Sequence, residues 1–286
     1  NGQFASISSA TASKQLNITG NSVAWTELLP ATSQDLMITS PAGQFEAKFN
    51  EPAGYVTALL VKPGPFIQRI YPAAAVPSTL AIAPGMLISI YGTGFVSTAL
   101  VANSLPFPTT LSGAQMLMNG SAIPLEYAGP YQVNAVVPSS ASGLVKFQYS
   151  DSGGNVSQTV NALVLAAVPE IFTQDQSGAG PAAALNVSNA PVTASNPLHA
   201  GDYVSLYLTG LGTVHASNGL DVADLQPTVM IGGKPCPVTF AGRAPGYQGL
   251  DQINCQLAAD VAPNASASVV VTSGAVTSNA PTVAIQ

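Results

Sequence analysis

The stretch "YQVNAVVP" (Tyr131–Pro138) returns later in the chain as "DQINCQLA" (Asp251–Ala258). Aligned on Gln132 and Gln252, the two copies lie 252 − 132 = 120 residues apart, which is about the length of one domain. In both copies Gln and Asn stand two positions apart, with apolar residues next to them. In a β-strand this pattern puts the amides on one face and the apolar side chains on the other. The sequence therefore predicts a duplicated β domain.

Two further pairs of segments extend the repeat on the N-terminal side. "APGMLISIYGTGF" (Ala83–Phe95) aligns with "HAGDYVSLYLTGL" (His199–Leu211). "MNGSAIPLEYAG" (Met118–Gly129) aligns with "IGGKPCPVTFAG" (Ile231–Gly242). The second copy then adds "RAPGYQGLD" (Arg243–Asp251), where the first has only "PY". We interpret this addition as a lengthened hairpin loop, because surface loops tolerate insertions at little cost.

Composition indicates an all-β protein. Gly (26) and Pro (23) punctuate the 286 residues, and the segments between them are rich in β-branched and aromatic residues. Short strands with a turn signal every 8 to 12 residues are typical of β-sandwiches. We expect tandem immunoglobulin-like β-sandwiches over residues 71–172 and 173–286. A small N-terminal β domain over residues 1–70 is expected to precede them.

The N-terminal segment shows no copy of the repeat. "QFEAKFN" alternates strictly, as a half-buried strand does, and Trp25 is the expected core anchor of this domain. The arm Asn1–Ser13 has no charged residue and no Pro, and Phe4 and Ile7 are its large apolar side chains. Such an arm is suited to joining the sheet edge of a neighbouring copy by strand addition. The alternative is that it folds back on its own domain.

The two cysteines replace apolar residues of the first copy. Cys236 aligns with Ile123, and Cys255 aligns with Ala135. If the two strands are neighbours, facing positions bring the Cα atoms to about 4.5–5.5 Å, which suits a disulfide. The alternative is a pair of buried free thiols. A metal site is disfavoured, because no further ligands stand at zinc spacing.

The repeated amides are candidates for ligand contact. Paired amides that face one way from a strand can hold a sugar or a peptide, and a tyrosine stands near each pair. The alternative is that the amides bond to backbone groups of loops. The candidate residues are Tyr131, Gln132 and Asn134 in the first copy and Tyr247, Gln252 and Asn254 in the second.

Motifs of catalysis and of cofactor binding are missing from the sequence. It contains no G-x-S-x-G, H-E-x-x-H, P-loop or dinucleotide fingerprint. His199 and His215 belong to no recognisable nucleophile–base arrangement and are expected in loops. The acidic stretch from Asn218 through Asp221 to Asp224 does not have the spacing of a calcium loop. We therefore predict no enzymatic activity, no cofactor and no metal.

Charge and hydropathy bear on the partners and the compartment. Charged residues make up 7% of the chain, against about 25% in an ordinary soluble protein, and the net charge is −6. Seven scattered Lys and Arg form no basic stripe, which argues against nucleic acid. The apolar run Ala162–Val168 is far shorter than a membrane helix needs. Low charge, Ser/Thr richness and the predicted disulfide favour a secreted protein. Asn1 in place of Met indicates either a processed terminus or a fragment.

Several of these motifs also occur together in a known family. "GTGF", "NGSAIPLEYAGPYQVNAVVP", "VPEIF", "LTGLGT" and "VTFAG…GLDQINCQL" stand in this order between Pro72 and Gln286. This region resembles the uncharacterised C-terminal domain family of secreted acidobacterial (Solibacter-type) proteins. The resemblance implies export and a surface or extracellular setting, and it carries over no catalytic residues.

Two classes of function follow. One is a non-enzymatic structural protein of the cell exterior, a self-assembling surface or filament subunit that binds copies of itself or other surface components. The other is an adhesin-type module that binds glycan or protein. Exposed Trp or Tyr clusters usually mark glycan sites, and the single Trp lies outside the repeats. The sequence therefore favours the structural class.

Overall fold

The computed structural model describes residues 64–74 and 81–286, together with the backbone of six strands between residues 3 and 57. The six strands form two three-stranded antiparallel sheets: β1 (Gln3–Ser9), β2 (Ala12–Thr19) and β3 (Ser22–Val23), and β4 (Leu36–Ser40), β5 (Gly43–Asn50) and β6 (Tyr55–Thr57). β5 contains the strand predicted from "QFEAKFN". Trp25 and the side chains of Phe4 and Ile7 lie outside the described residues.

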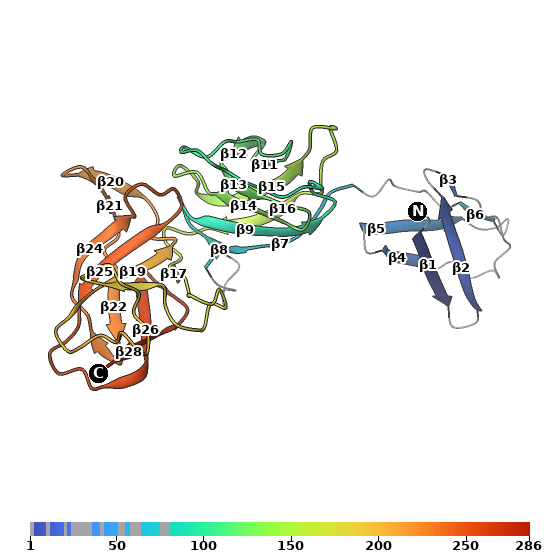
Figure 1. Cartoon of the computed structure of the whole chain (residues 1–286). Coiled ribbons are helices and arrows are strands. Elements are labelled where there is room, and N and C mark those ends of the chain that lie inside the picture. Colours follow the sequence, from blue (N-terminus) through green and yellow to red (C-terminus); the bar gives the residue numbers. More distant parts are fainter. Residues whose placement is uncertain are drawn as a thin grey trace.

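The first sandwich consists of two five-stranded sheets (Figure 1). One sheet has the order β10 (Leu100–Val101), β13 (Leu125–Ala128), β14 (Gln132–Val136), β9 (Leu87–Thr93) and β7 (Phe66–Pro72). The other has the order β12 (Ser121–Ile123), β11 (Gln115–Met118), β15 (Gly143–Ser150), β16 (Val160–Val164) and β8 (Ala81–Ile82). All pairs are antiparallel except β8 with β16.

The second sandwich repeats this plan with additional strands. Its larger sheet has the order β17 (Glu170–Ile171), β19 (Tyr203–Thr209), β25 (Asp251–Gln256), β24 (Val238–Arg243), β21 (Leu220–Ala223) and β20 (Val214–Ser217), with β18 (Ala184–Asn186) also paired to β19. Its smaller sheet has the order β23 (Lys234–Pro235), β22 (Thr228–Ile231), β26 (Asn264–Ser273) and β27 (Val276–Thr277), with β28 (Thr282–Ile285) also paired to β26.

Strict alternation along the strands builds a core inside each sandwich. In β15, Val145, Phe147 and Tyr149 point inward and are at most 1% exposed. In β25 the inward residues are Asp251, Ile253 and Cys255, and the amides between them face outward. Burying one such apolar side chain contributes about 1.5–3 kcal/mol, so alternation of this kind fixes which face of each sheet is covered.

The duplication seen in the sequence is present in the backbone. Gly85 and its counterpart Gly201 have φ of +71° and +86°, and Gly94 and its counterpart Gly210 have φ of +70° and +92°. The parallel pairing of β8 with β16 also recurs, as a bridge between Leu198 and Ile285. Matched turns therefore require matched left-handed residues, which glycine adopts without strain.

The fold is all-β, with tandem immunoglobulin-like sandwiches, as the composition predicted; the described residues contain no α-helix. The strands also locate the boundaries more closely. β7 begins at Phe66, so the first sandwich starts before the predicted residue 71. β17 pairs with β19, so Glu170 and Ile171 belong to the second sandwich rather than to the first. Among the residues that the structure describes, no helix is long and apolar enough to cross a membrane.

Candidate functional site

The inserted loop of the second repeat lies at the junction between the two sandwiches. β24 and β25 form its stem, and Arg243 pairs with Asp251 at the end of their ladder. Beyond this pair the loop reaches the first sandwich, where the side-chain oxygen of Gln248 accepts the backbone N–H of Phe107 (2.8 Å). The predicted surface loop is therefore a contact between domains.

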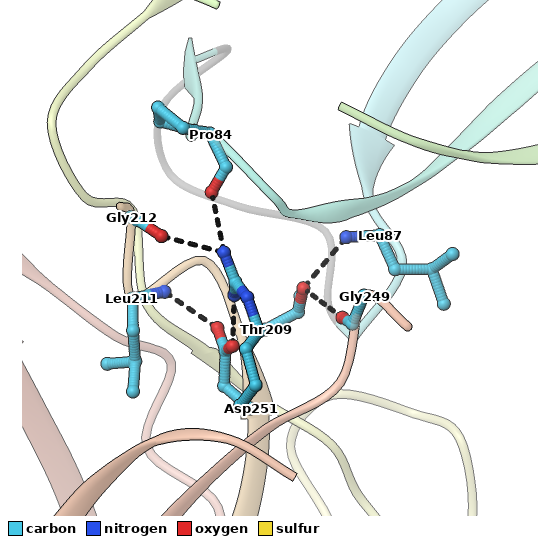
Figure 2. A network of polar contacts seen from close by, with 8 residues as sticks. Pro84, Leu87, Thr209, Leu211, Gly212, Gly249 and Asp251 are labelled. Carbon is cyan, nitrogen blue, oxygen red and sulfur yellow. Dashed lines mark hydrogen bonds and ion pairs between the residues drawn. The ribbon is translucent and has the colours of Figure 1, made fainter. Parts of the chain in front are cut away.

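A buried ion pair lies at the base of this loop (Figure 2). The Asp251 carboxylate is fully buried and pairs with the guanidinium of Arg243, whose side chain is 14% exposed. The second oxygen of Asp251 accepts the backbone N–H of Leu211 (2.8 Å). Burial raises the pKa of the Asp251 carboxyl, whereas the Arg243 guanidinium and this N–H oppose the rise. The carboxylate is held by partners from two separate segments of the second sandwich.

The guanidinium also joins the two sandwiches. Arg243 Nη2 donates to the carbonyl of Gly212 in the second sandwich (2.7 Å) and reaches the carbonyl of Pro84 in the first (3.4 Å). Gly85 follows Pro84, and a side chain on Gly85 would overlap the guanidinium. The counterpart Gly201 has open space at the same position. Close approach therefore requires glycine at residue 85 in addition to the left-handed turn.

Thr209 provides a second bridge beside the ion pair (Figure 2). Its buried hydroxyl accepts the backbone N–H of Leu87 in the first sandwich (2.9 Å) and donates to the carbonyl of Gly249 in the loop (2.8 Å). The backbone N–H of Val168 donates to the carbonyl of Gly210 (2.8 Å). Because buried polar groups are costly to leave unpaired, these bonds favour one relative orientation of the sandwiches.

A groove of about 630 Å³ opens beside the junction. Its walls come from the end of β14, from the β20–β21 hairpin and from the inserted loop. Pro138, Leu220 and Pro245 supply apolar surface, and Asp221 and Tyr247 supply polar groups. Tyr247 is 66% exposed.

The repeated amides face outward and bond to each other. The Gln132 amide nitrogen donates to Asn134 (2.7 Å), and the Gln252 amide nitrogen donates to Asn254 (2.8 Å). Neither of these two bonds reaches the loop backbone that the alternative interpretation invoked. The two pairs lie on different sandwiches, so the candidate residues do not form one site. Tyr131, 71% exposed, lies in the β13–β14 turn, apart from Tyr247 in the groove.

The predicted disulfide is not formed: Cys236 and Cys255 are free buried thiols. The position that faces Cys255 on β24 is Val238, not Cys236, which lies in the segment between β23 and β24. The thiols nevertheless contact each other, and this hydrogen bond together with burial raises the pKa of Cys255. The premise of facing positions on two neighbouring strands was therefore wrong.

The histidines and the acidic stretch are occupied by local contacts. His215 Nδ1 lies 2.8 Å from Asp224, and the backbone N–H of His199 donates to Asp202 (2.8 Å). Hydrogen bonds from Thr213 and His215 lower the pKa of Asp224. Asp221 lines the groove instead of joining Asp224. Over the described ranges, no group of three or more His, Cys, Asp or Glu could hold a metal ion.

The assembly arm forms a strand in the structure. β1 pairs with β2 of the same chain along its whole length, from Gln3 opposite Ile18 to Ser9 opposite Ala12. β1 is also the edge strand of its sheet. The pairing agrees with the alternative that the arm folds back, and the edge position leaves open the addition of a further strand.

The residues of the junction were not predicted from the sequence. Arg243 and Asp251 stand at the two ends of the inserted "RAPGYQGLD", and opposite charges are rare in a chain with 7% charged residues. Two opposite charges at the ends of the insertion were the sequence feature that could have indicated an ion pair. The sequence contained no such signal for Thr209. Its counterpart Thr93 is also a threonine, and that residue is partly exposed at the edge of the first sandwich.

No protein-family model matches the sequence, and no curated protein matches it significantly. Solved structures that match the chain at low identity include the SGBP-B protein of the Bacteroides ovatus mixed-linkage glucan utilization locus, in complex with a mixed-linkage heptasaccharide. That match has 14% identity and a TM-score of 0.33, and it covers 89% of this chain and 53% of that chain. The chain thus spans about half the length of that protein. The I9–I11 tandem of titin also matches, with 11% identity and a TM-score of 0.21, over 99% of this chain and 88% of that chain. The D00–D0 domain of intimin matches with 14% identity and a TM-score of 0.20, over 76% of this chain and 98% of that chain.

Proposed function

We propose that this chain is a non-enzymatic structural element of the cell exterior, in which the two sandwiches form one rigid building block. The junction is the observation that carries the proposal. Its contacts include a buried ion pair whose guanidinium reaches the first sandwich, a buried threonine that bonds to both sides, and a backbone hydrogen bond between the sandwiches. A flexible linker needs none of these. Fixed geometry is what a subunit requires if successive copies are to assemble in register.

Copies would join through β1, whose outer edge can pair with a sheet edge of the next copy. Each hydrogen bond of such an added strand contributes about 1 kcal/mol net, and ordering each residue costs about 1–2 kcal/mol. A single arm therefore binds weakly. Assembly also requires contacts between rigid domains, so this proposal depends on the junction as well. The proposed setting is secreted or cell-surface, with the chain itself or other surface components as partners.

Spin labels on the two sandwiches test rigidity. Cysteines introduced at the exposed residues Asn161 and Ser266 would carry the labels, while the buried native thiols stay unlabelled. We expect a narrow distance distribution in the parent protein and a broad one after Thr209→Val, which removes the hydroxyl between Leu87 and Gly249. The matched control is Thr93→Val at the aligned position of the first sandwich, which should change nothing. A broad distribution in the parent protein would refute the rigid block.

Assembly is tested separately by deleting residues 1–13. Sedimentation and electron microscopy should show oligomers of the full chain that the deletion abolishes. A full chain that stays monomeric at high concentration, or oligomers that survive the deletion, would contradict assembly through the arm. Because the labels are read in the monomer, the test of the rigid block does not depend on whether the chain assembles.

A further inference from the structure

The outer face of the first sandwich carries an ordered array of aromatic and polar side chains. Strand register places Tyr127, Asn134, Ser89 and Tyr71 in one row across β13, β14, β9 and β7. The next row contains Gln132, Tyr91 and Arg69. Ile88 and Ile90 of β9 point into the core, so Ser89 and Tyr91 face out. We call these seven residues the tyrosine face: Arg69, Tyr71, Ser89, Tyr91, Tyr127, Gln132 and Asn134.

Hydrogen bonds hold the centre of the tyrosine face in place. Asn134 Oδ1 accepts from Ser89 Oγ (3.0 Å) and from Gln132 Nε2 (2.7 Å). Asn134 Nδ2 donates to Glu126 Oε2 (2.9 Å). Each amide is thus fixed in one rotamer. A ligand that contacts them loses little affinity to side-chain ordering, which otherwise costs about 0.5–1.5 kcal/mol per side chain.

The tyrosine rings are also placed by packing. The rings of Tyr71 and Tyr91 lie 6.4 Å apart at 58°, and the Arg69 guanidinium lies 5.9 Å from the centre of the Tyr71 ring. The Tyr127 ring lies against Gly129 so closely that a side chain at residue 129 would overlap it. Three rings therefore flank the amides in defined positions. Rings with hydroxyl groups beside amide donors and acceptors suit a sugar, which offers C–H faces and hydroxyls.

The second sandwich keeps the scaffold of this face but not its outward chemistry. Gln252 still bonds to Asn254, as in the first copy. The cross-strand partner of Ser205 is Leu185, whereas that of Ser89 in the first copy is Tyr71. The cross-strand partner of Asn254 is Phe240, whereas that of Asn134 is Tyr127. The internal amide pair thus serves both sandwiches. The positions of Tyr71 and Tyr127 carry no hydroxyl group in the second sandwich, whereas Tyr207 keeps the position of Tyr91.

Charge points to the kind of sugar. Residues 64–168 hold two cations and two carboxylates, Arg69 and Lys146 against Glu126 and Asp151. Residues 169–286 hold two cations against seven carboxylates, a net charge of −5. Within the described part of the chain, Lys234 and Arg243 form ion pairs and Arg69 does not. A carboxylate on a ligand would therefore be drawn to Arg69 on β7, and it would be repelled by Glu126 on β13 and by the second sandwich.

We propose that the tyrosine face binds an acidic glycan, a chain that contains uronate residues. A uronate carboxylate would pair with Arg69, sugar rings would lie against Tyr71, Tyr91 and Tyr127, and hydroxyls would bond to Gln132. From β7 to β13 there are three strand spacings, about 14 Å, so the site spans several sugar units. The inference does not depend on the rigid block or on the arm.

Affinity electrophoresis with polygalacturonate, alginate or hyaluronate in the gel tests the proposal, followed by calorimetry with the glycan that retards the protein. We expect Tyr91→Ala and Arg69→Gln each to weaken binding at least tenfold, and Arg69→Gln also to reduce its salt dependence. The matched control is Tyr207→Ala, at the position of Tyr91 in the second sandwich, which should bind normally. Circular dichroism would confirm that each variant is folded.

Three results would overturn the proposal. Retardation by none of the three glycans would exclude an acidic glycan ligand of this face. An equal loss in the Tyr207→Ala variant would place binding elsewhere. Equal affinity for polygalacturonate and for its methyl ester would show that the carboxylate is not recognised.

Discussion

The Arg243→Met substitution separates the charge of the junction from its packing. Methionine keeps most of the apolar stem of arginine and removes the guanidinium. Asp251 would then be a fully buried carboxylate without a cation. Removing one partner of a buried ion pair typically costs about 3–5 kcal/mol. The protein can limit this loss by binding a proton at Asp251.

The free energy needed to protonate Asp251 limits the loss of stability and makes that loss depend on pH. A carboxyl with an unfolded pKa of about 3.9 costs about 1.4 kcal/mol per pH unit to protonate above that value, or about 4 kcal/mol at pH 7 and about 1.5 kcal/mol at pH 5. The carbonyls of Gly212 and Pro84 also lose a donor, which adds about 1 kcal/mol at either pH. Burial already raises the pKa of Asp251 in the parent, so part of this cost is present before the substitution. We therefore expect a loss of at most about 4–5 kcal/mol at pH 7 and of at most about half that at pH 5.

The sign follows from proton binding. In the variant the folded state holds a proton at Asp251 that the unfolded chain releases, so the folded pKa is raised. Burial already raises the pKa of Asp251 in the parent, and loss of the guanidinium raises it further. The stability of the variant relative to the parent is therefore greatest below the folded pKa of the parent and falls as the pH rises from there toward the folded pKa of the variant.

Urea unfolding followed by far-ultraviolet circular dichroism at pH 5 and pH 7 measures both losses. Lys234→Met is the control, because it breaks the exposed pair with Asp260 and should change stability little at either pH. A loss below about 1 kcal/mol at pH 7, or one of equal size at both pH values, would refute the role assigned to the buried carboxylate.

Three further predictions concern other parts of the fold. Burial raises the pKa of Glu170, so the stability that the protonated side chain contributes is lost as the pH rises above about 4 through the folded pKa. Glu170→Gln should therefore stabilise the protein at pH 7 and flatten the pH dependence of the unfolding free energy. A destabilised variant would contradict this. Cys236 and Cys255 should react with a thiol reagent only after unfolding, because both are at most 2% exposed; unfolded, unreduced protein without free thiols would instead reveal a disulfide. Gly85→Ala and Gly201→Ala should each lower the unfolding free energy by about 1–2 kcal/mol, because both glycines have a left-handed backbone. Gly85→Ala should cost several kcal/mol more, because the added side chain displaces the guanidinium of the ion pair. Thermal unfolding measures both, and equal losses would show that the close approach at Gly85 does not matter.

Alternation and repetition made the fold predictable from the sequence. Gln132 and Asn134 had to share one face of a strand, and a second copy 120 residues later had to form the same strand in a second domain. Paired glycines marked matching turns, and their φ values agree between the copies. These inferences needed only the local geometry of the chain, because side-chain direction in a strand is set by position.

The cysteines show where such reasoning fails. The alignment placed Cys236 at the position of Ile123 and Cys255 at the position of Ala135, and the two thiols contact each other. The sequence did not say which residue of β24 faces Cys255, because a register shift between Val238 and Phe240 alters the pairing. Bulges of this kind depend on the twist and closure of the whole sheet.

The sequence alone determined two β domains, a hydrophobic interior in each and an insertion in the second. Tertiary structure decided what the insertion does. Its loop length and its Pro and Gly content indicated a surface feature. In the structure the guanidinium of the buried pair of Arg243 and Asp251 also lies against Pro84 and Gly85 of the other sandwich. Periodicity is a property of neighbouring residues, whereas burial of a charge depends on atoms more than a hundred positions away. No local pattern encodes that distance.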